Sequence, residues 1–363
     1  MKKNLLFLFS FVSYYAMYAQ QIENKTLLDV LQNDTSTKTE TQSTPRKLNV
    51  YLDSKYENYT RIREYDPNES KFRVVQSRVY AKGVFSNKVT YQLRYRLNES
   101  VASNALEFAF LEYSPDEHWT IGLGKQFTAW GSMELSYNSA DLYLFTNIIS
   151  SIELFSPGAS VAYKTHGQSF KLQAISPTTQ FASEEFKNKA YAGLFLWEGK
   201  LFQDHLQVRY GYGLFQHNAN KFYSWITLGN RLTTGNWMAE LDWIYGSRNI
   251  TDTQFPTIAD KQPISYIRDN VTTMSLKYKL NKMTPYVKAV YNYRTDLDTN
   301  NSYSSTGISA AIEYNPFETE LMKQLRLYAA YNYITYDYKN YNTIGNQSES
   351  QIAIGARWMI PLF

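Results

Sequence analysis

The chain has 363 residues and no cysteine, so disulfide bonds, thiol catalysis and thiolate metal sites are excluded. After the first twenty residues there is also no apolar run of the ~20 residues that a helix needs to cross a bilayer. Runs of Lys and Arg dense enough to bind nucleic acid are missing as well. The formal charge is +4, and it falls to +2 without residues 1–19, which carry Lys2 and Lys3 and no acid. We therefore expect neither an α-helical membrane protein nor a nucleic-acid partner.

Motifs for catalysis and for metal or nucleotide binding are absent too. The four histidines are scattered without the spacing of metal ligands: His118, His166, His205 and His217. Gly122-Leu-Gly124 is not followed by a helical pattern, so it is no nucleotide fingerprint, and the sequence contains no Gly-x-Ser-x-Gly. The carboxylates of Glu240 and Asp242 are better interpreted as a polar wall than as an acid–base pair. We predict no catalytic residue, no metal and no cofactor.

Aromatic residues are abundant. They make up 16% of the chain, with 32 Tyr, 20 Phe and 7 Trp. Tyr and Trp suit a boundary between apolar and polar surroundings, because an apolar ring carries one hydrogen-bonding group. The mean hydropathy of −0.46 is low for a membrane protein. A β-barrel with a wet interior explains this value, because every second residue of its strands faces water.

The N-terminus has the pattern of an exported protein. Lys2 and Lys3 precede a short apolar stretch at 5–12, and Ala19 is a small residue at the expected cleavage point. We predict a signal peptide at 1–19, with its cleavage site approximate. Residues 20–46 are polar and rich in Thr and Ser, and they bury too little apolar surface to fold. We interpret them as a flexible periplasmic tail.

From residue 47 to residue 363 the dominant hydrophobic period is two. In Val89–Asn98 and in Trp237–Tyr245, apolar and aromatic residues alternate with polar and charged ones, as in a strand with one apolar face. The strands run about ten residues, which at a tilt near ~40° gives roughly 25 Å, the height of the apolar band of an outer-membrane barrel. Strands of a soluble sandwich are shorter, about five or six residues. We predict an all-β, transmembrane, antiparallel up-and-down barrel.

About 16 strands are predicted, and counts of 14 or 18 remain alternatives. The expected strand starts are residues 47, 72, 87, 104, 118, 158, 168, 189, 206, 222, 236, 271, 284, 304, 323 and 349. Short turns such as 233–236 and 280–283 suit the periplasmic side, and the longer stretches 246–270 and 294–304 suit the outside. The C-terminal Phe363 resembles the assembly signal of bacterial outer-membrane proteins, and Pro361 marks a frayed strand end or a bulge.

One connection, 127–157, is about thirty residues long and has no clean strand pattern. Loops of this length in a compact domain are functional or disordered, and this one is rich in apolar and aromatic residues such as Trp130, Tyr143 and Phe145. We expect it to fold into the lumen after the fifth strand and to narrow the barrel. An extracellular lid, or a loop that packs on a neighbouring subunit, is the alternative.

Four segments in and beside this loop form a recognisable set: Gly122–Phe127, Met133–Ser136, Ser139–Phe145 and Phe155–Gly158. In these segments the sequence resembles the phosphate-selective porins O and P. The resemblance implies a 16-stranded porin of the outer membrane of a Gram-negative bacterium, assembled as a homotrimer and surrounded by lipid. It implies passive diffusion of small hydrophilic solutes or ions. The alternatives are a barrel without a channel, as an adhesin, a structural protein or a barrel enzyme. A ligand-gated transporter would need a folded plug, for which 20–46 is too short.

The sequence departs from this family where selectivity is concerned. Phosphate selectivity there is attributed to Lys and Arg in the pore, whereas between Gln126 and Tyr163 this chain has no Lys, Arg or His. The loop carries three acids, so we expect weak cation preference or near neutrality and do not carry over phosphate. The predicted residues of the pore lining and constriction are Lys125, Trp130, Glu134, Asp141 and Glu153 at the loop and Arg78, Lys82, Arg94, Arg96, Glu240, Asp242, Lys277, Lys279 and Arg326 on the wall.

Overall fold

The computed structural model describes residues 47–64, 67–99, 105–149, 152–177, 183, 185–186, 188–251, 264–319, 322–339 and 346–362. The predicted signal peptide, the predicted tail and Phe363 lie outside them. The strands are β1 Lys47–Arg63, β2 Glu69–Ser86, β3 Val89–Arg96, β4 Leu106–Tyr113, β5 Trp119–Phe127, β6 Phe155–Thr165, β7 Gln168–Ile175, β8 Ala192–Leu201, β9 Leu206–Gln216, β10 Phe222–Thr234, β11 Trp237–Thr251, β12 Ile264–Tyr278, β13 Met283–Asp296, β14 Ser302–Tyr314, β15 Leu325–Lys339 and β16 Gln347–Pro361.

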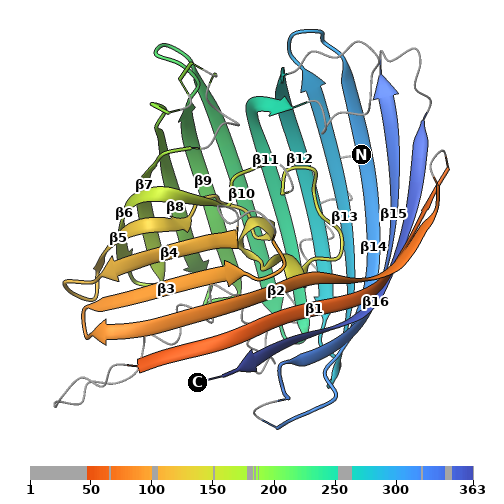
Figure 1. Cartoon of the computed structure of the whole chain (residues 1–363), viewed down its shortest axis with the longest axis horizontal. Coiled ribbons are helices and arrows are strands. Elements are labelled where there is room, and N and C mark those ends of the chain that lie inside the picture. Colours follow the sequence, from red (N-terminus) through yellow and green to blue (C-terminus); the bar gives the residue numbers. More distant parts are fainter. Residues whose placement is uncertain are drawn as a thin grey trace.

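The strands form one closed barrel in which each pairs with its neighbours in the sequence and β1 pairs with β16 (Figure 1). Every pairing is antiparallel. The predicted fold is confirmed. Fifteen strand starts lie within three residues of the prediction, and Pro361 stands at the end of β16. No helix within the described ranges is long and apolar enough to cross a membrane.

Two predicted connections had bounds that were too wide. In the stretch 246–270, β11 continues to Thr251 and β12 begins at Ile264, where these two residues pair. The stretch 294–304 reduces to the short connection 297–301 between β13 and β14. Strands are 8 to 18 residues long rather than uniformly about ten, because main-chain pairing continues beyond the alternating segments on which the prediction rested.

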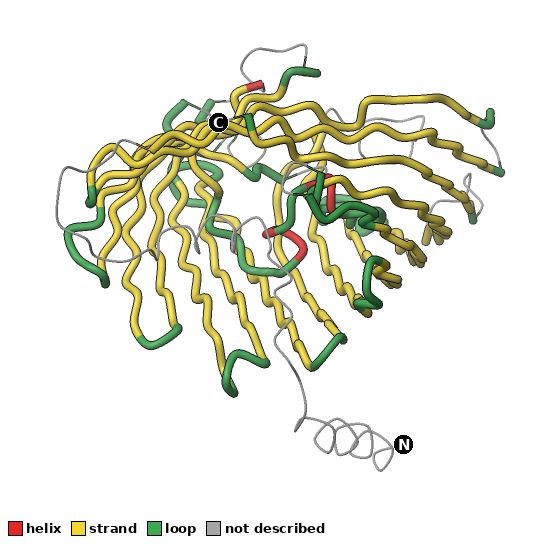
Figure 2. The backbone as a smooth tube through the Cα atoms, turned by 90° about the horizontal axis from the view of Figure 1, so that it is seen from below, coloured by secondary structure: helices red, strands yellow, loops and turns green. Residues whose placement is uncertain are grey.

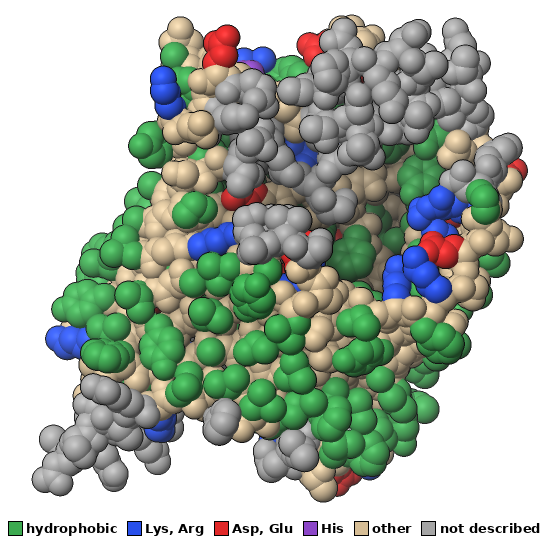
Figure 3. Space-filling model, viewed as in Figure 1, with side chains coloured by type: hydrophobic (Ala, Val, Ile, Leu, Met, Phe, Trp, Pro, Cys, Tyr) green, Lys and Arg blue, Asp and Glu red, His purple; other side chains and the backbone are tan. Residues whose placement is uncertain are grey.

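The two faces of the wall have opposite chemistry. Apolar residues at alternate positions are exposed, for example Leu93 at 38% and Leu241 at 51%, whereas the intervening Arg94 and Asp242 are buried inside the barrel. Figure 3 shows hydrophobic side chains spread over the outer surface. Since lipid favours apolar side chains and a wet interior favours polar ones, this is the arrangement of a barrel that crosses a membrane.

The segment between β5 and β6 lies inside the ring of strands in both Figure 1 and Figure 2. We call residues 128–149 and 152–154 the lumen segment. It contains two short 3-10 helices, η1 (Glu134–Ser136) and η2 (Ser139–Asp141). Its apolar side chains join inward-facing residues of β7–β12 in a buried hydrophobic cluster that includes Trp130, Ile148 and Trp225.

Candidate functional site: the constriction inside the barrel

The lumen segment enters along the inner surface of β9 and β10, where its main chain lies against two glycines of the wall. A Cβ on Gly131 would be 2.4 Å from the main-chain nitrogen of Gly211, and one on Gly229 would be 2.5 Å from that of Met133. The N–H of Gly131 donates to Thr227 Oγ1 over 2.7 Å. Any larger residue would push the segment toward the centre of the lumen, because real Cβ atoms do not approach so closely.

Asp242 of β11 fixes the next turn of the segment. Its carboxylate accepts three hydrogen bonds, from Ser132 Oγ at 2.7 Å and from the main-chain N–H groups of Met133 at 2.9 Å and Glu134 at 2.7 Å. Ser132 has a φ of 72°, a left-handed conformation that is unfavourable for serine. Hydrogen bonds to a charged acceptor are stronger than neutral ones, so Asp242 offsets that strain and orients η1.

The acids of the lumen segment are paired with bases of the wall. Glu134 lies 3.0 Å from Lys288 Nζ of β13, and both side chains are buried. Asp141 accepts hydrogen bonds from Arg326 of β15, at 2.6 Å, and from Arg357 of β16. Burial raises the pKa of Asp141, but the guanidiniums of Arg357 and Arg326 outweigh this and hold the pKa well below its usual range.

These ion pairs correct the reasoning from the sequence about charge. The three acids of the loop add up to a local charge of −3 when taken alone, but Glu134 and Asp141 each face at least one base. The main-chain carbonyl of Glu153 accepts a hydrogen bond from the indole N–H of Trp130 at 2.8 Å. The acids of the loop are therefore no longer a sufficient reason to expect a cation preference.

Two tyrosines in the middle part of the segment bind acids of the wall. The hydroxyl of Tyr137 donates to Glu240 over 2.5 Å, and the hydroxyl of Tyr143 donates to Glu313 over 2.8 Å. Lys277 lies 4.8 Å from the ring centroid of Tyr137, within the range of a cation–π interaction. The segment thus contacts the wall from β9 through β16 at many points, and its position is set by a network rather than by a single bond.

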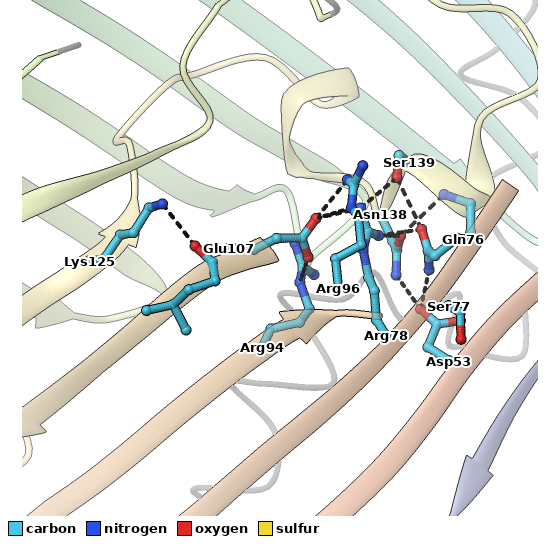
Figure 4. Close-up of polar contacts among 12 residues, drawn as sticks. Asp53, Gln76, Ser77, Arg78, Arg94, Arg96, Glu107, Lys125, Asn138 and Ser139 are labelled. Atoms are coloured by element: carbon cyan, nitrogen blue, oxygen red, sulfur yellow. Dashed lines mark hydrogen bonds and ion pairs between the residues drawn. The ribbon is translucent and has the colours of Figure 1, made fainter. Parts of the chain in front are cut away.

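On the β2–β4 side, an arginine cluster surrounds one carboxylate (Figure 4). The guanidiniums of Arg78, Arg94 and Arg96 all point toward Glu107 of β4. Arg78 also donates to Asn138 Oδ1 over 2.8 Å and to Ser139 Oγ over 3.1 Å, which connects the cluster to η2. The constriction therefore has polar, charged walls on this side.

Not all predicted lining residues belong to this network. Lys125 donates to the main-chain oxygen of Leu106 over 2.8 Å, away from the arginines in Figure 4. Lys82 is buried in β2 and lines a cavity described below. Lys279 lies in the turn after β12.

The network also contains residues that the sequence reasoning missed, among them Asp53, Glu107, Asn138, Lys288, Glu313 and Arg357. Lys288 and Arg357 alternate with apolar residues, so the period-two pattern could have assigned both to the inner face. Glu107 gave no such signal, because a bulge in β4 changes the alternation at that point.

Two adjoining cavities are lined in part by the lumen segment and mainly by the strands β2–β9. One has a volume of about 430 Å³ and extends toward the turns that follow β4, β6 and β8. The other, of about 210 Å³, shares Lys164, Glu198 and Arg209 with it. The lining of the smaller cavity includes four bases, among them Lys82 and Lys171, and two acids. Among the residues that the structure describes, no group of acids and histidines could hold a metal ion.

Comparison with known families agrees with the sequence resemblance. The family model of phosphate-selective porin O and P matches residues 47–220. The family predicted from the sequence is therefore confirmed over β1 to β9 and the lumen segment. A comparison with curated protein sequences gave no match.

Solved structures similar to this one include an outer-membrane channel, a porin and an outer-membrane protein. The channel DcaP of Acinetobacter baumannii has 12% identity and a TM-score of 0.63, over 88% of this chain and 99% of that one. An anion-selective porin from Comamonas acidovorans has 10% identity and a TM-score of 0.60, over 87% and 100%. OmpT of Vibrio cholerae, in its trimer form, has 14% identity and a TM-score of 0.60, over 87% and 100%. At these identities the likeness shows the fold.

Proposed function

We propose that this chain, whose residues 47–220 are those of a porin O and P family protein, is a channel for the passive diffusion of small hydrophilic solutes across the outer membrane of a Gram-negative bacterium. One observation carries the proposal. Inward-facing positions of the strands are polar and charged, and outward-facing positions are apolar. A barrel with this distribution holds water inside and lipid outside.

The lumen segment defines where solutes pass. It packs against the inner surface of β7–β12 through a hydrophobic cluster and reaches β13–β15 through buried polar contacts. The cavities lie beside the segment, on the side of the barrel formed mainly by β2–β9. We therefore place the route along that side. Selectivity there depends on the diameter of the passage and the charge of its lining rather than on a tight binding site.

The charge of this route favours weak anion preference. The smaller cavity is lined by Lys82, Lys164, Lys171 and Arg209 but only by the acids Glu112 and Glu198. Because the two loop acids Glu134 and Asp141 are already paired, they add little negative potential. This replaces the weak cation preference that the sequence alone suggested.

Two experiments test the proposal. Liposome swelling with neutral sugars of increasing size should show entry of small solutes and exclusion of larger ones, and equal behaviour of protein-free liposomes would refute a pore. Reversal potentials in a KCl gradient should show an anion-to-cation permeability ratio slightly above one. Pronounced cation preference would show that the lining charge has been assigned wrongly.

We further propose that the protein acts as a channel rather than as an enzyme or adhesin, and that three copies assemble in the lipid bilayer. The trimer is supported by the family resemblance and by the trimer form of the similar OmpT structure. Native mass spectrometry from detergent should give three times the monomer mass. A monomer under conditions that preserve the fold would contradict this assembly.

A further inference from the structure

Glu107 has an unusual number of positive partners. Its Oε1 lies 2.7 Å from Nη2 of Arg78 and 2.7 Å from Nη2 of Arg96, and its Oε2 lies 2.6 Å from Nε of Arg94. Three guanidiniums thus share one carboxylate, as they would share a bound oxyanion. Arg78, Arg94 and Glu107 are almost fully buried, while the side chain of Arg96 is 33% exposed. Ions in the lumen can approach the cluster at Arg96.

The backbone places this carboxylate by a β-bulge. Arg94 pairs with Phe108, but the next residue, Tyr95, pairs with Leu106, so Glu107 is the extra residue in β4. Regular alternation would have put Glu107 and Phe108 on opposite faces of the wall. Instead both are buried inside, with the Arg94 guanidinium 4.7 Å from the ring centroid of Phe108. Bulges re-aim side chains in this way.

The carboxylate does not saturate the arginines. The cluster holds three positive charges and one negative charge, and Asp53 contacts Gln76, Asn138 and Arg357 rather than these arginines. Nε of Arg78 and Nη1 of Arg94 are buried and have no hydrogen-bond partner in the described part of the chain. Buried donors without partners are unfavourable, and they leave the cluster able to hold more negative charge than Glu107 supplies.

We infer that Glu107 is a built-in occupant of an oxyanion site and the residue that limits the anion selectivity of this pore. This inference rests on the proposed channel function. The Glu107 carboxylate occupies the position between the three guanidiniums, so a permeating anion cannot bind there and passes without being retained. Without it, the same three guanidiniums form a site for a small divalent oxyanion.

Two substitutions separate the effect of the charge of Glu107 from the effect of its side-chain volume. Glu107→Ala removes the carboxylate and leaves its volume to an incoming anion, whereas Glu107→Gln removes the charge and keeps the volume filled. The matched control is Glu349→Ala, which breaks glutamate–arginine pairs with Arg61 and Arg63 between β16 and β1, away from both cavities. Each purified barrel is studied in planar bilayers in KCl, with millimolar sulfate added as the probe.

The two variants should differ in a defined way. Because an unneutralised cation cluster attracts anions, Glu107→Gln should raise the chloride-to-potassium permeability ratio about threefold or more, with little block by sulfate. Glu107→Ala should show both the raised ratio and reversible block of about half the current by sulfate. Wild type and Glu349→Ala should show little block. Equal permeability ratios in wild type and Glu107→Gln would overturn the inference, as would equal sulfate block in wild type and Glu107→Ala.

A binding measurement keeps the inference separate from the channel function. Sulfate should raise the unfolding temperature of detergent-solubilised Glu107→Ala but not that of wild type. If no variant conducts, the proposed function fails and this shift still decides whether the oxyanion site exists. If Glu107→Ala does not fold, the reversal potential of Glu107→Gln decides, and an unchanged value refutes the role of Glu107.

Discussion

The attachment of the lumen segment at Asp242 can be tested with Asp242→Asn. The carboxylate accepts from Ser132, Met133 and Glu134 through both of its oxygens. An asparagine has one oxygen, and its NH₂ group would face a donor in place of the other. At least one buried N–H then lacks an acceptor, which costs about 1–3 kcal/mol. The remaining bonds lose their charge assistance, so we expect a total of roughly 2–5 kcal/mol.

This energy predicts a large change in the position of the segment. Since ~1.4 kcal/mol is a factor of ten, the detached population should rise about 30-fold to several thousand-fold. The cysteine-free sequence allows a single reporter, Ser136→Cys, which is buried in the attached state. Maleimide labelling of this thiol should be about 30-fold faster or more in the Asp242→Asn background. Single-channel currents should gain a second, larger conductance level.

Asp116→Asn is the matched control for this measurement. Asp116 also accepts two main-chain hydrogen bonds, from His118 and Trp119, but in the turn between β4 and β5. The Asp116→Asn variant should leave the labelling rate of the Ser136→Cys reporter and the single-channel current unchanged. Labelling in Asp242→Asn at the wild-type rate, with an unaltered current, would refute the role assigned to Asp242.

Three further predictions concern the close packing at Gly131, the lipid-facing surface of β5 and the charge of Asp141. Gly131→Ala should displace the segment and alter the single-channel current, because its Cβ would lie 2.3 Å from a carbonyl oxygen, whereas Gly193→Ala, with nothing within 4 Å, should match wild type. Leu123→Arg on the lipid-facing side of β5 should destabilise the barrel in vesicles by ~2–4 kcal/mol, measured by urea unfolding, if that face is in the bilayer. Asp141→Asn should raise anion preference in reversal-potential measurements. The depressed pKa of Asp141 keeps it ionised above its folded-state pKa, so the difference from wild type should persist at pH 4 and disappear only in stronger acid.

The barrel wall could be predicted from sequence because alternation is a local property. Val89–Asn98 and Trp237–Tyr245 each carry the pattern of a strand between lipid and water, and the structure has β3 and β11 there. The start of β12 was missed by seven residues, since Ile267 points inward and Arg268 outward, the reverse of the pattern. Beyond the apolar band, the membrane no longer selects which residue faces out.

The contacts of the constriction could not be predicted in the same way. Glu134 meets Lys288 across 154 positions of sequence, and Asp141 meets Arg357 across 216. Alternation shows that such residues face the interior, but the partner of each depends on the path of the lumen segment. A count of charges in the loop alone is therefore an incomplete basis for selectivity, because the fold pairs Glu134 and Asp141 with bases of the wall.

The central claim is that the interior of this barrel is a continuous aqueous path, and planar-bilayer conductance tests it most directly. Purified, folded protein should insert in discrete current steps whose size grows in proportion to the conductivity of the KCl solution. Folded protein that is resistant to protease and inserted in the bilayer, yet gives no current steps, would contradict the account.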